Sequence, residues 1–384
     1  MDTQGYRTAA CGFFCALLLA MSDHALAQTA PTPLSTPKDL PLSITVDDSA
    51  LTLMVLLVPT VYLSGIIDSG SPARFEALMH SGKIPPGAIV LLNSPGGDLV
   101  AGLALGRLFR QGEMRVYISK PYDVVKQEGS GAPAAICVSA CAYAYFGGLY
   151  RMRPSGDHQF GIHQFYLGNT HTADVGAIQQ ASGEVVSYLH EMGINPDIFR
   201  LASTADRNQV VWLTGEQMLN AGLSNDGKEP LKASYKLVEG HPYLVLEQKT
   251  FEGTHKIAFQ CLGEQMMLTS YYMVGHDRAE EIVKRGTRSY FEVNERPVLI
   301  QPKDGALPLN LSVASMRVVP IEFLRPLQSA ESIGAWIDDM NGTHRYGFTI
   351  ELKSVWPDIQ DYYKNCLVMP APKRQVQGER HGTI

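Results

Sequence analysis

The chain has 384 residues, of which 45% are hydrophobic and 18% are charged, so it can bury a sizeable core and does not have the composition of a disordered protein. Its formal net charge is −6 at pH 7, which disfavours a nucleic-acid partner and a polybasic membrane-binding surface. Small molecules, peptides and other proteins remain as targets.

An apolar run near the N-terminus predicts export. Residues 8–21 are too few to span a bilayer as a stable helix, Arg7 precedes them, and the small residues ALA follow at 25–27. We therefore expect residues 1–27 to be a signal peptide that is cleaved after Ala27, and the mature protein to be periplasmic or secreted. An uncleaved N-terminal membrane anchor is the alternative.

Three regions and a tail follow the predicted signal peptide. Residues 28–48 are rich in proline and predict an extended linker. Residues 49–230 alternate apolar runs with helical periodicity, which predicts an α/β domain with a largely parallel sheet. Residues 235–370 predict a smaller β-rich (α+β) accessory domain, because short strand-like segments alternate there with turn residues. Residues 371–384 are polar and predict a flexible tail.

The expected elements alternate along the α/β domain. Strands are predicted at 51–65, 88–94 and 114–119, and helices at 99–112 and 174–192. In the β-rich domain, strand-like segments occur at 243–248, 255–261, 290–295, 298–302 and 317–323, and short helices are expected near 327–340 and 355–364.

Four cysteines remain after the predicted cleavage, namely Cys137, Cys141, Cys261 and Cys366, and they allow three disulfide pairings. We expect a disulfide between Cys261 and Cys366 in the β-rich domain. Cys137 and Cys141 are interpreted as packing residues or as a local disulfide, with a nucleophilic cysteine as the alternative. The sequence contains no CxxC, HExxH, P-loop or GxGxxG motif, so we expect neither a metal nor a cofactor.

Three short motifs carry the residue types that acyl transfer requires. The sequence NSPGG at 93–97 ends a buried strand, Ser139 precedes an apolar helix, and His163 follows 24 residues later. Acyl transfer needs a nucleophile, a base and backbone N–H donors for the developing oxyanion. A glycine pair lets the backbone approach a substrate closely, so Gly96 is expected beside the substrate. Each motif alone is usually structural, but their order and strand context together predict a catalytic site.

These motifs resemble the proteolytic subunit of the Clp protease and its exported relatives in both order and spacing. The resemblance covers residues 58–226, and it includes Asp206 with Arg207 ahead of the segment LTGEQMLNAGL at 213–223. It implies a Clp/crotonase-type fold, in which repeated ββα units stack into a spiral.

The resemblance also implies a role for each matching residue. Ser139 would be the nucleophile, His163 the general base, and Asp206 the residue that orients the imidazole. The backbone N–H groups of Gly97 and Ala140 would form the oxyanion hole.

The chain departs from the family pattern near the nucleophile. Cys137 stands where the family has glycine, Ala140 stands where it has methionine, and residues 120–134 have the character of an insertion. The alignment around Asp206 is imperfect. Other candidates for the third residue are therefore Asp174, Asp197 and Asn208.

We therefore predict an exported serine peptidase that cleaves peptides or unfolded segments without an ATPase partner, because ATP is not available outside the cytoplasm. The resemblance further implies a homo-oligomer. One alternative is a catalytically decayed module that captures a peptide or a partner protein. Others are a crotonase-like acyl-CoA enzyme and a serine–lysine dyad that uses Lys120 or Lys126.

Overall fold

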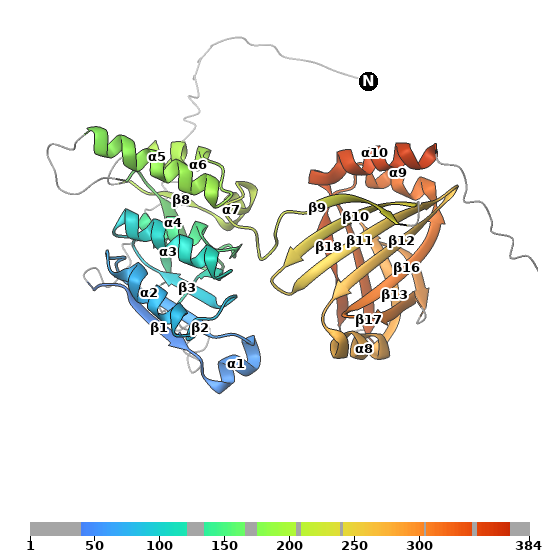
Figure 1. Cartoon of the computed structure of the whole chain (residues 1–384), viewed down its shortest axis with the longest axis horizontal. Helices are drawn as coiled ribbons and strands as arrows, with labels where there is room; N and C mark the ends of the chain where they lie inside the picture. Colours follow the sequence, from blue (N-terminus) through green and yellow to red (C-terminus); the bar gives the residue numbers. More distant parts are fainter. Residues whose placement is uncertain are drawn as a thin grey trace, which may run out of the picture. The chain divides into compact units, whose positions relative to one another are not determined.

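The structure is a computed structural model that describes residues 40–120, 134–165, 175–204, 209–238, 241–302, 305–339 and 344–368. The predicted signal peptide and tail lie outside these ranges. The described elements are of mixed α/β type, as the sequence predicts (Figure 1). Their two largest hydrophobic cores are separate along the chain, one built from residues 42–223 and the other from residues 244–366. Within the described ranges, no helix has both the length and the apolar composition needed to cross a membrane.

The N-terminal half alternates strands and helices. Its elements are β1 (Ser43–Asp47), α1 (Ala50–Leu56), β2 (Thr60–Ser64), α2 (Ser71–His80), β3 (Ile89–Asn93), α3 (Leu99–Gln111), β4 (Arg115–Ile118), β5 (Ile136–Val138), α4 (Ala140–Phe146), β6 (Tyr150–Arg151), β7 (Gln159–Ile162), α5 (Val175–Glu191), α6 (Asp197–Ser203), β8 (Val211–Leu213) and α7 (Gly215–Asn220). Strand β1 thus falls within the segment that the sequence predicts to be a linker.

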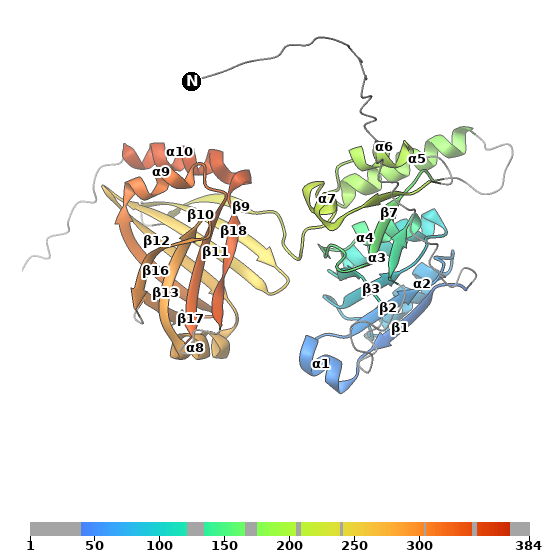
Figure 2. The same ribbon diagram turned by 180° about the vertical axis from the view of Figure 1, so that it is seen from behind.

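The strands of this half form two sheets that meet at the end of β3. The first has the order β1-β2-β3-β4-β6, with β1 antiparallel and the other strands parallel. Figure 2 labels its first three strands. The second has the order β5-β7-β8, with β5 and β7 parallel and β8 antiparallel. A parallel bridge between Ser94 and Cys137 joins the two sheets. The carboxyl ends of β3, β5 and β7 therefore lie at one edge.

Glycines allow helix α3 to pack closely on its neighbours. Asp98 caps this helix by accepting a hydrogen bond from the N–H of Ala101 at 2.8 Å. A Cβ atom at Gly102 would lie 2.5 Å from the carbonyl oxygen of Ala140, and one at Gly106 would overlap the Tyr188 hydroxyl. Both glycines are buried in the core. The close contact at Gly102 brings the start of α4 against α3.

The apolar run at 51–65 is not the continuous strand that the sequence predicts. Its first half forms α1, because Ser49 Oγ accepts a hydrogen bond from the N–H of Thr52 and starts a helix. Leu57 ends that helix in a left-handed conformation, and strand β2 begins only after Pro59. The other strands and helices predicted in this half are confirmed by β3, α3, β4 and α5.

The C-terminal half is rich in strands. Its elements are β9 (Lys232–Val238), β10 (His241–Thr250), β11 (Gly253–Leu262), β12 (Gln265–Met273), α8 (His276–Arg285), β13 (Gly286–Val293), β14 (Arg296–Pro302), β15 (Ala306–Leu309), β16 (Ser312–Pro320), η2 (Ile321–Phe323), α9 (Leu324–Leu327), β17 (Ser332–Asp339), β18 (Arg345–Glu351), η3 (Lys353–Val355) and α10 (Trp356–Leu367).

Two antiparallel sheets make up this half. The strand-like segments predicted at 243–248, 255–261 and 298–302 lie within β10, β11 and β14, whereas those at 290–295 and 317–323 overlap β13 and β16 and extend past their ends. The sheets have the orders β15-β16-β12-β11-β10-β9 and β14-β13-β17-β18. Phe259 and Phe291 from the two sheets and Ile359 from α10 are fully buried in the same core. The hydroxyl of Tyr362 in α10 also accepts a hydrogen bond from the N–H of Cys261 at 3.2 Å. Helix α10 is thus an integral part of this core.

The helix predicted near 327–340 is wrong, whereas the one near 355–364 is confirmed by α10. Helix α9 ends at Leu327, and Ser332–Asp339 form β17 between β13 and β18. The alternating residues Ile333, Ala335 and Ile337 are buried on this strand. One of its hydrogen-bond partners, β18, is the next strand along the chain, but the other, β13, is distant in sequence, so local periodicity did not reveal this strand.

Candidate active site

Ser139 forms a sharp turn between strand β5 and helix α4. Its backbone has φ 60° and ψ −125°, a combination that residues other than glycine rarely adopt. All seven residues of α4 are buried, whereas Ser139 itself is partly exposed. Such a conformation costs about 1–3 kcal/mol and persists only where the surroundings hold it. The structure therefore presents a strained, partly exposed serine at the start of a buried helix.

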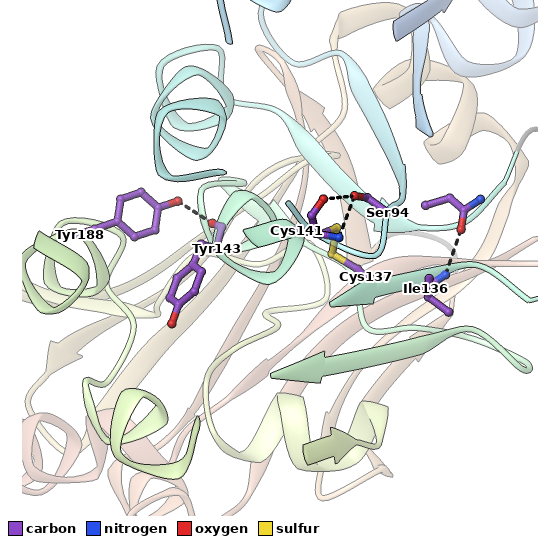
Figure 3. Close-up of a disulfide and its surroundings, with 8 residues drawn as sticks. Ser94, Ile136, Cys137, Cys141, Tyr143 and Tyr188 are labelled. Carbon is purple, nitrogen blue, oxygen red and sulfur yellow. Dashed lines mark hydrogen bonds between the residues drawn. A yellow bond between two sulfur atoms is a disulfide. The ribbon is translucent and has the colours of Figure 1, made fainter. Parts of the chain in front are cut away.

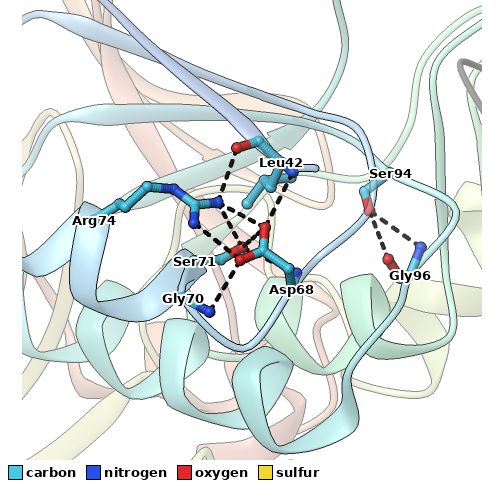
Figure 4. A network of polar contacts seen from close by, with 7 residues as sticks. All are labelled: Leu42, Asp68, Gly70, Ser71, Arg74, Ser94 and Gly96. Atoms are coloured by element: carbon cyan, nitrogen blue, oxygen red, sulfur yellow. Dashed lines mark hydrogen bonds and ion pairs between the residues drawn. The ribbon is translucent and has the colours of Figure 1, made fainter. Parts of the chain in front are cut away.

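The glycine turn that follows β3 lies directly against this serine. Gly96 has φ +101°, and a Cβ atom placed there would lie 2.7 Å from Ser139 Cβ and 2.7 Å from the carbonyl oxygen of Val138. Ser94 Oγ stabilises the turn by accepting a hydrogen bond from the N–H of Gly96 at 3.1 Å (Figure 4). No side chain fits at position 96, and the glycine therefore packs on the candidate nucleophile.

Hydrogen bonds made by the residues before and after Gly97 set the direction in which its own backbone groups point. The carbonyl oxygen of Gly96 accepts from the N–H of Ile67, and the N–H of Asp98 donates to the carbonyl oxygen of Ile67, both at 2.8 Å. In an extended segment, backbone groups alternate in direction, so the N–H of Gly97 points away from Ile67. The segment's other neighbour is the end of β5, where Ser139 lies.

The N–H of Ala140 is the second oxyanion donor that the sequence predicts. Ala140 is the first residue of α4, so its N–H has no acceptor within the helix. The added Cβ atom at Gly96 would lie 3.1 Å from this nitrogen. The two predicted donors therefore lie on either side of the same glycine.

Strand pairing brings His163 to the same edge as Ser139. Val138, the last residue of β5, lies opposite Gly161 of the parallel strand β7. Ser139 and His163 therefore both follow the carboxyl ends of neighbouring strands. His163 Nδ1 lies 2.7 Å from the carbonyl oxygen of Gln164. In the tautomer that donates Nδ1–H to this oxygen, Nε2 is an acceptor and can serve as a base.

Asp206 lies outside the described residues, as do the alternatives Asp174 and Asn208. Strand β8 is antiparallel to β7, with Val211 opposite Ile162, so the chain enters β8 at the edge where His163 lies. Asp197 begins α6 and lies 3.6 Å from Arg200 in an exposed ion pair. The third residue of the predicted triad thus stays a prediction.

Of the two lysines considered for a dyad, Lys120 is described and Lys126 is not. Lys120 follows the carboxyl end of β4, and burial lowers the pKa of its ammonium group. Strand β4 pairs with β3 and not with β5. His163, which follows the strand next to Ser139, therefore has the closer topological relation to the serine.

Two polar residues whose individual roles were not predicted join β5 to β3. Asn93 Oδ1 accepts a hydrogen bond from the N–H of Ile136 at 3.1 Å. The N–H of Ser94 donates to the carbonyl oxygen of Ile136 at 2.8 Å (Figure 3 shows Ser94 and Ile136). Both side chains are buried. Polar residues at the end of an otherwise apolar strand were the sequence signal for this role.

An ion pair that no sequence motif indicated stabilises the segment behind Gly97. Asp68 follows Ile67 and accepts hydrogen bonds from both terminal nitrogens of Arg74, at 2.9 and 2.7 Å (Figure 4). These bonds, with further ones from Ser71 and Gly70, hold the pKa of Asp68 well below its usual range. The carboxylate therefore stays charged at neutral pH and anchors the strand end on which the glycine turn rests.

Both cysteine pairs form disulfides. Cys137 and Cys141 have their Cα atoms 5.2 Å apart, which confirms the local disulfide among the interpretations of this pair (Figure 3). A cysteine in a disulfide carries no thiol, so neither residue is a free nucleophile here. The predicted pair Cys261 and Cys366 is also bonded, with Cα atoms 5.8 Å apart. This second bond links β11 to α10.

Comparison with known proteins found no matching family model and no matching curated protein. Among solved structures, the chain is similar to an asparagine-to-aspartate variant of ClpP1 from Listeria monocytogenes. The identity is 16% over 46% of this chain and 94% of that chain, with a TM-score of 0.33. It is also similar to a serine-to-alanine variant of the 1510-N membrane-bound stomatin-specific protease. Here the identity is 19% over 43% of this chain and 75% of that chain, with a TM-score of 0.29.

Proposed function

We propose that this chain is a serine hydrolase of the peptidase class, with Ser139 as its nucleophile. The observation that carries the proposal is the left-handed conformation of Ser139 at a buried strand–helix turn, with Gly96 packed on its Cβ atom. A structural serine has no need of this conformation, whereas a nucleophile gains an exposed hydroxyl beside the free N–H groups of a helix start.

The arrangement supports acyl transfer by general base catalysis. Ser139 Oγ attacks the carbonyl carbon of a peptide bond while His163 Nε2 takes the hydroxyl proton. The N–H groups of Gly97 and Ala140 stabilise the oxyanion, and the imidazolium returns the proton to the leaving amine. Water then hydrolyses the acyl-enzyme by the same route in reverse. Asp206 is proposed as the residue that orients the imidazole.

We further propose that the enzyme works after export, in the periplasm or outside the cell. Two disulfides support this placement, because such bonds persist in oxidising compartments. Its substrates are then peptides or unfolded segments that reach the site without an ATPase.

The test is labelling of the purified mature protein, residues 28–384, with a fluorophosphonate. In this reaction the oxygen of an activated serine displaces fluoride from the phosphorus atom of the reagent. We expect one label per chain, carried by Ser139. Ser139→Ala should remove it, and His163→Ala should slow it by about 10²-fold or more, because a general base contributes 10²–10⁴-fold. Ser81→Ala, a change at an exposed serine after α2, is the matched control and should label normally.

A folded sample that does not label would overturn the hydrolase and favour the binding module. Labelling that survives in Ser139→Ala would exclude this serine as the nucleophile.

The predicted homo-oligomer has a candidate contact surface on α1. None of its residues is buried, and exposed apolar side chains cover it: Leu51, Leu53, Met54, Val55 and Leu56. Membrane-surface helices carry lysine or arginine on their polar side, whereas residues 43–57 contain neither and include Asp47 and Asp48. We therefore propose that a second copy of this chain covers α1.

Met54→Glu/Val55→Glu should reduce the mass of the assembly in light scattering, since these side chains are 73% and 65% exposed and a charge would enter the interface. Val368→Glu, at an 81% exposed position after α10, should leave the mass unchanged. A monomeric parent protein at micromolar concentration would overturn this proposal.

A further inference from the structure

A disulfide spans the candidate nucleophile. Cys137 lies in β5 and Cys141 in the first turn of α4, with a sequence separation of 4, so Ser139 is the central residue of the closed loop. Both cysteines are fully buried. The bond therefore acts on the backbone of the one residue in this turn with a left-handed conformation.

The disulfide is incompatible with two unstrained backbone conformations at Ser139. If β5 continued as a strand, the Cα atoms of Cys137 and Cys141 would be about 13 Å apart, at about 3.3 Å per residue, whereas a disulfide needs about 4.4–6.8 Å. If α4 began earlier and included both cysteines, their Cβ atoms would be about 5–6 Å apart, beyond the about 3.5–4.5 Å that a disulfide allows. A sharp turn at Ser139 satisfies the bond, as the observed Cα separation of 5.2 Å shows.

We propose that Cys137 and Cys141 are positioning residues whose disulfide holds Ser139 in its reactive conformation, so that the serine becomes reactive only after the bond has formed. This inference rests on the proposed function. In the step itself, two thiols lose two protons and two electrons to an exchanging protein disulfide, which is reduced to two thiols. The enzyme is consequently unreactive in a reducing compartment and is activated where disulfides form.

The test uses the mature protein with Cys261→Ala/Cys366→Ala, so that one cysteine pair remains. The protein is prepared oxidised, reduced with a phosphine, and reoxidised with glutathione disulfide, and fluorophosphonate labelling of Ser139 is timed in each state. We expect the reduced form to label at least tenfold more slowly and reoxidation to restore the rate. The plateau rate in the pH profile of labelling should fall in the reduced form.

Recovery of the labelling rate on reoxidation distinguishes a positioning role of the disulfide from a packing role of the two cysteines, because reduction removes no heavy atom from the core. Cys137→Ala/Cys141→Ala provides a second measurement, and we expect the same slow rate without recovery on oxidation. Reduced and oxidised proteins that are both folded by circular dichroism and label within twofold of each other would overturn the inference and leave the proposed function intact. An oxidised protein that does not label at all would instead refute the proposed function.

Discussion

Gly96→Ala is expected to lower the free energy of unfolding by about 3 kcal/mol and to slow labelling of Ser139 by about 10²-fold. The new Cβ atom would lie 2.7 Å from Ser139 Cβ and from the carbonyl oxygen of Val138. Overpacking of this kind costs about 1–3 kcal/mol, and the left-handed backbone at φ +101° adds about 1–2 kcal/mol. Moving a nucleophile by about 1 Å costs about 10²-fold in rate.

Urea denaturation and timed fluorophosphonate labelling measure the two effects. Gly82→Ala is the matched control, because Gly82 also has a positive φ, of +76°, but nothing lies within 4 Å of its added Cβ atom. We expect it to lose about 1 kcal/mol through the backbone and to label at the parent rate. A Gly96→Ala protein that labels within threefold of the parent would contradict the contact between the glycine turn and Ser139.

Cys261→Ala/Cys366→Ala is expected to lower the free energy of unfolding of the C-terminal half by about 4–5 kcal/mol. The bond closes a loop with a sequence separation of 105 between β11 and α10, and the chain-entropy model assigns that loss to a ring of this length. Labelling of Ser139 should be unaffected, because the bond lies in a core separate from that of the site.

Tryptophan fluorescence in urea measures this loss, since Trp336 and Trp356 both belong to the C-terminal half. The matched comparison is Cys137→Ala/Cys141→Ala, whose loop has a separation of only 4 and is expected to lose about 2 kcal/mol. Cys261→Ala/Cys366→Ala should therefore lose more stability but label normally, whereas Cys137→Ala/Cys141→Ala should lose less stability but label slowly. A shift of less than 1 kcal/mol for the longer loop would show that the C-terminal core is stable without its disulfide.

Much of the candidate site could be predicted from the sequence because its parts are local motifs at strand ends. NSPGG, Ser139 and His163 each follow an apolar segment, and parallel strands bring their carboxyl ends to one edge. The ion pair that stabilises the segment behind the glycine turn could not be predicted in the same way. Asp68 and Arg74 are ordinary surface residues in the sequence, and only the fold places them behind Gly97.

The sequence by itself determined the mixed α/β class and the order of the three motifs, since these depend on short patterns. Its four cysteines allowed three disulfide pairings, and the structure shows which of them forms. Tertiary structure decided that 332–339 is a strand, because it lies between β18, the next strand along the chain, and β13, which is remote in sequence. It also decided the left-handed conformation of Ser139, which contacts with Gly96 and the disulfide across the turn hold in place. Local propensity opposes that conformation, so no local pattern could have predicted it.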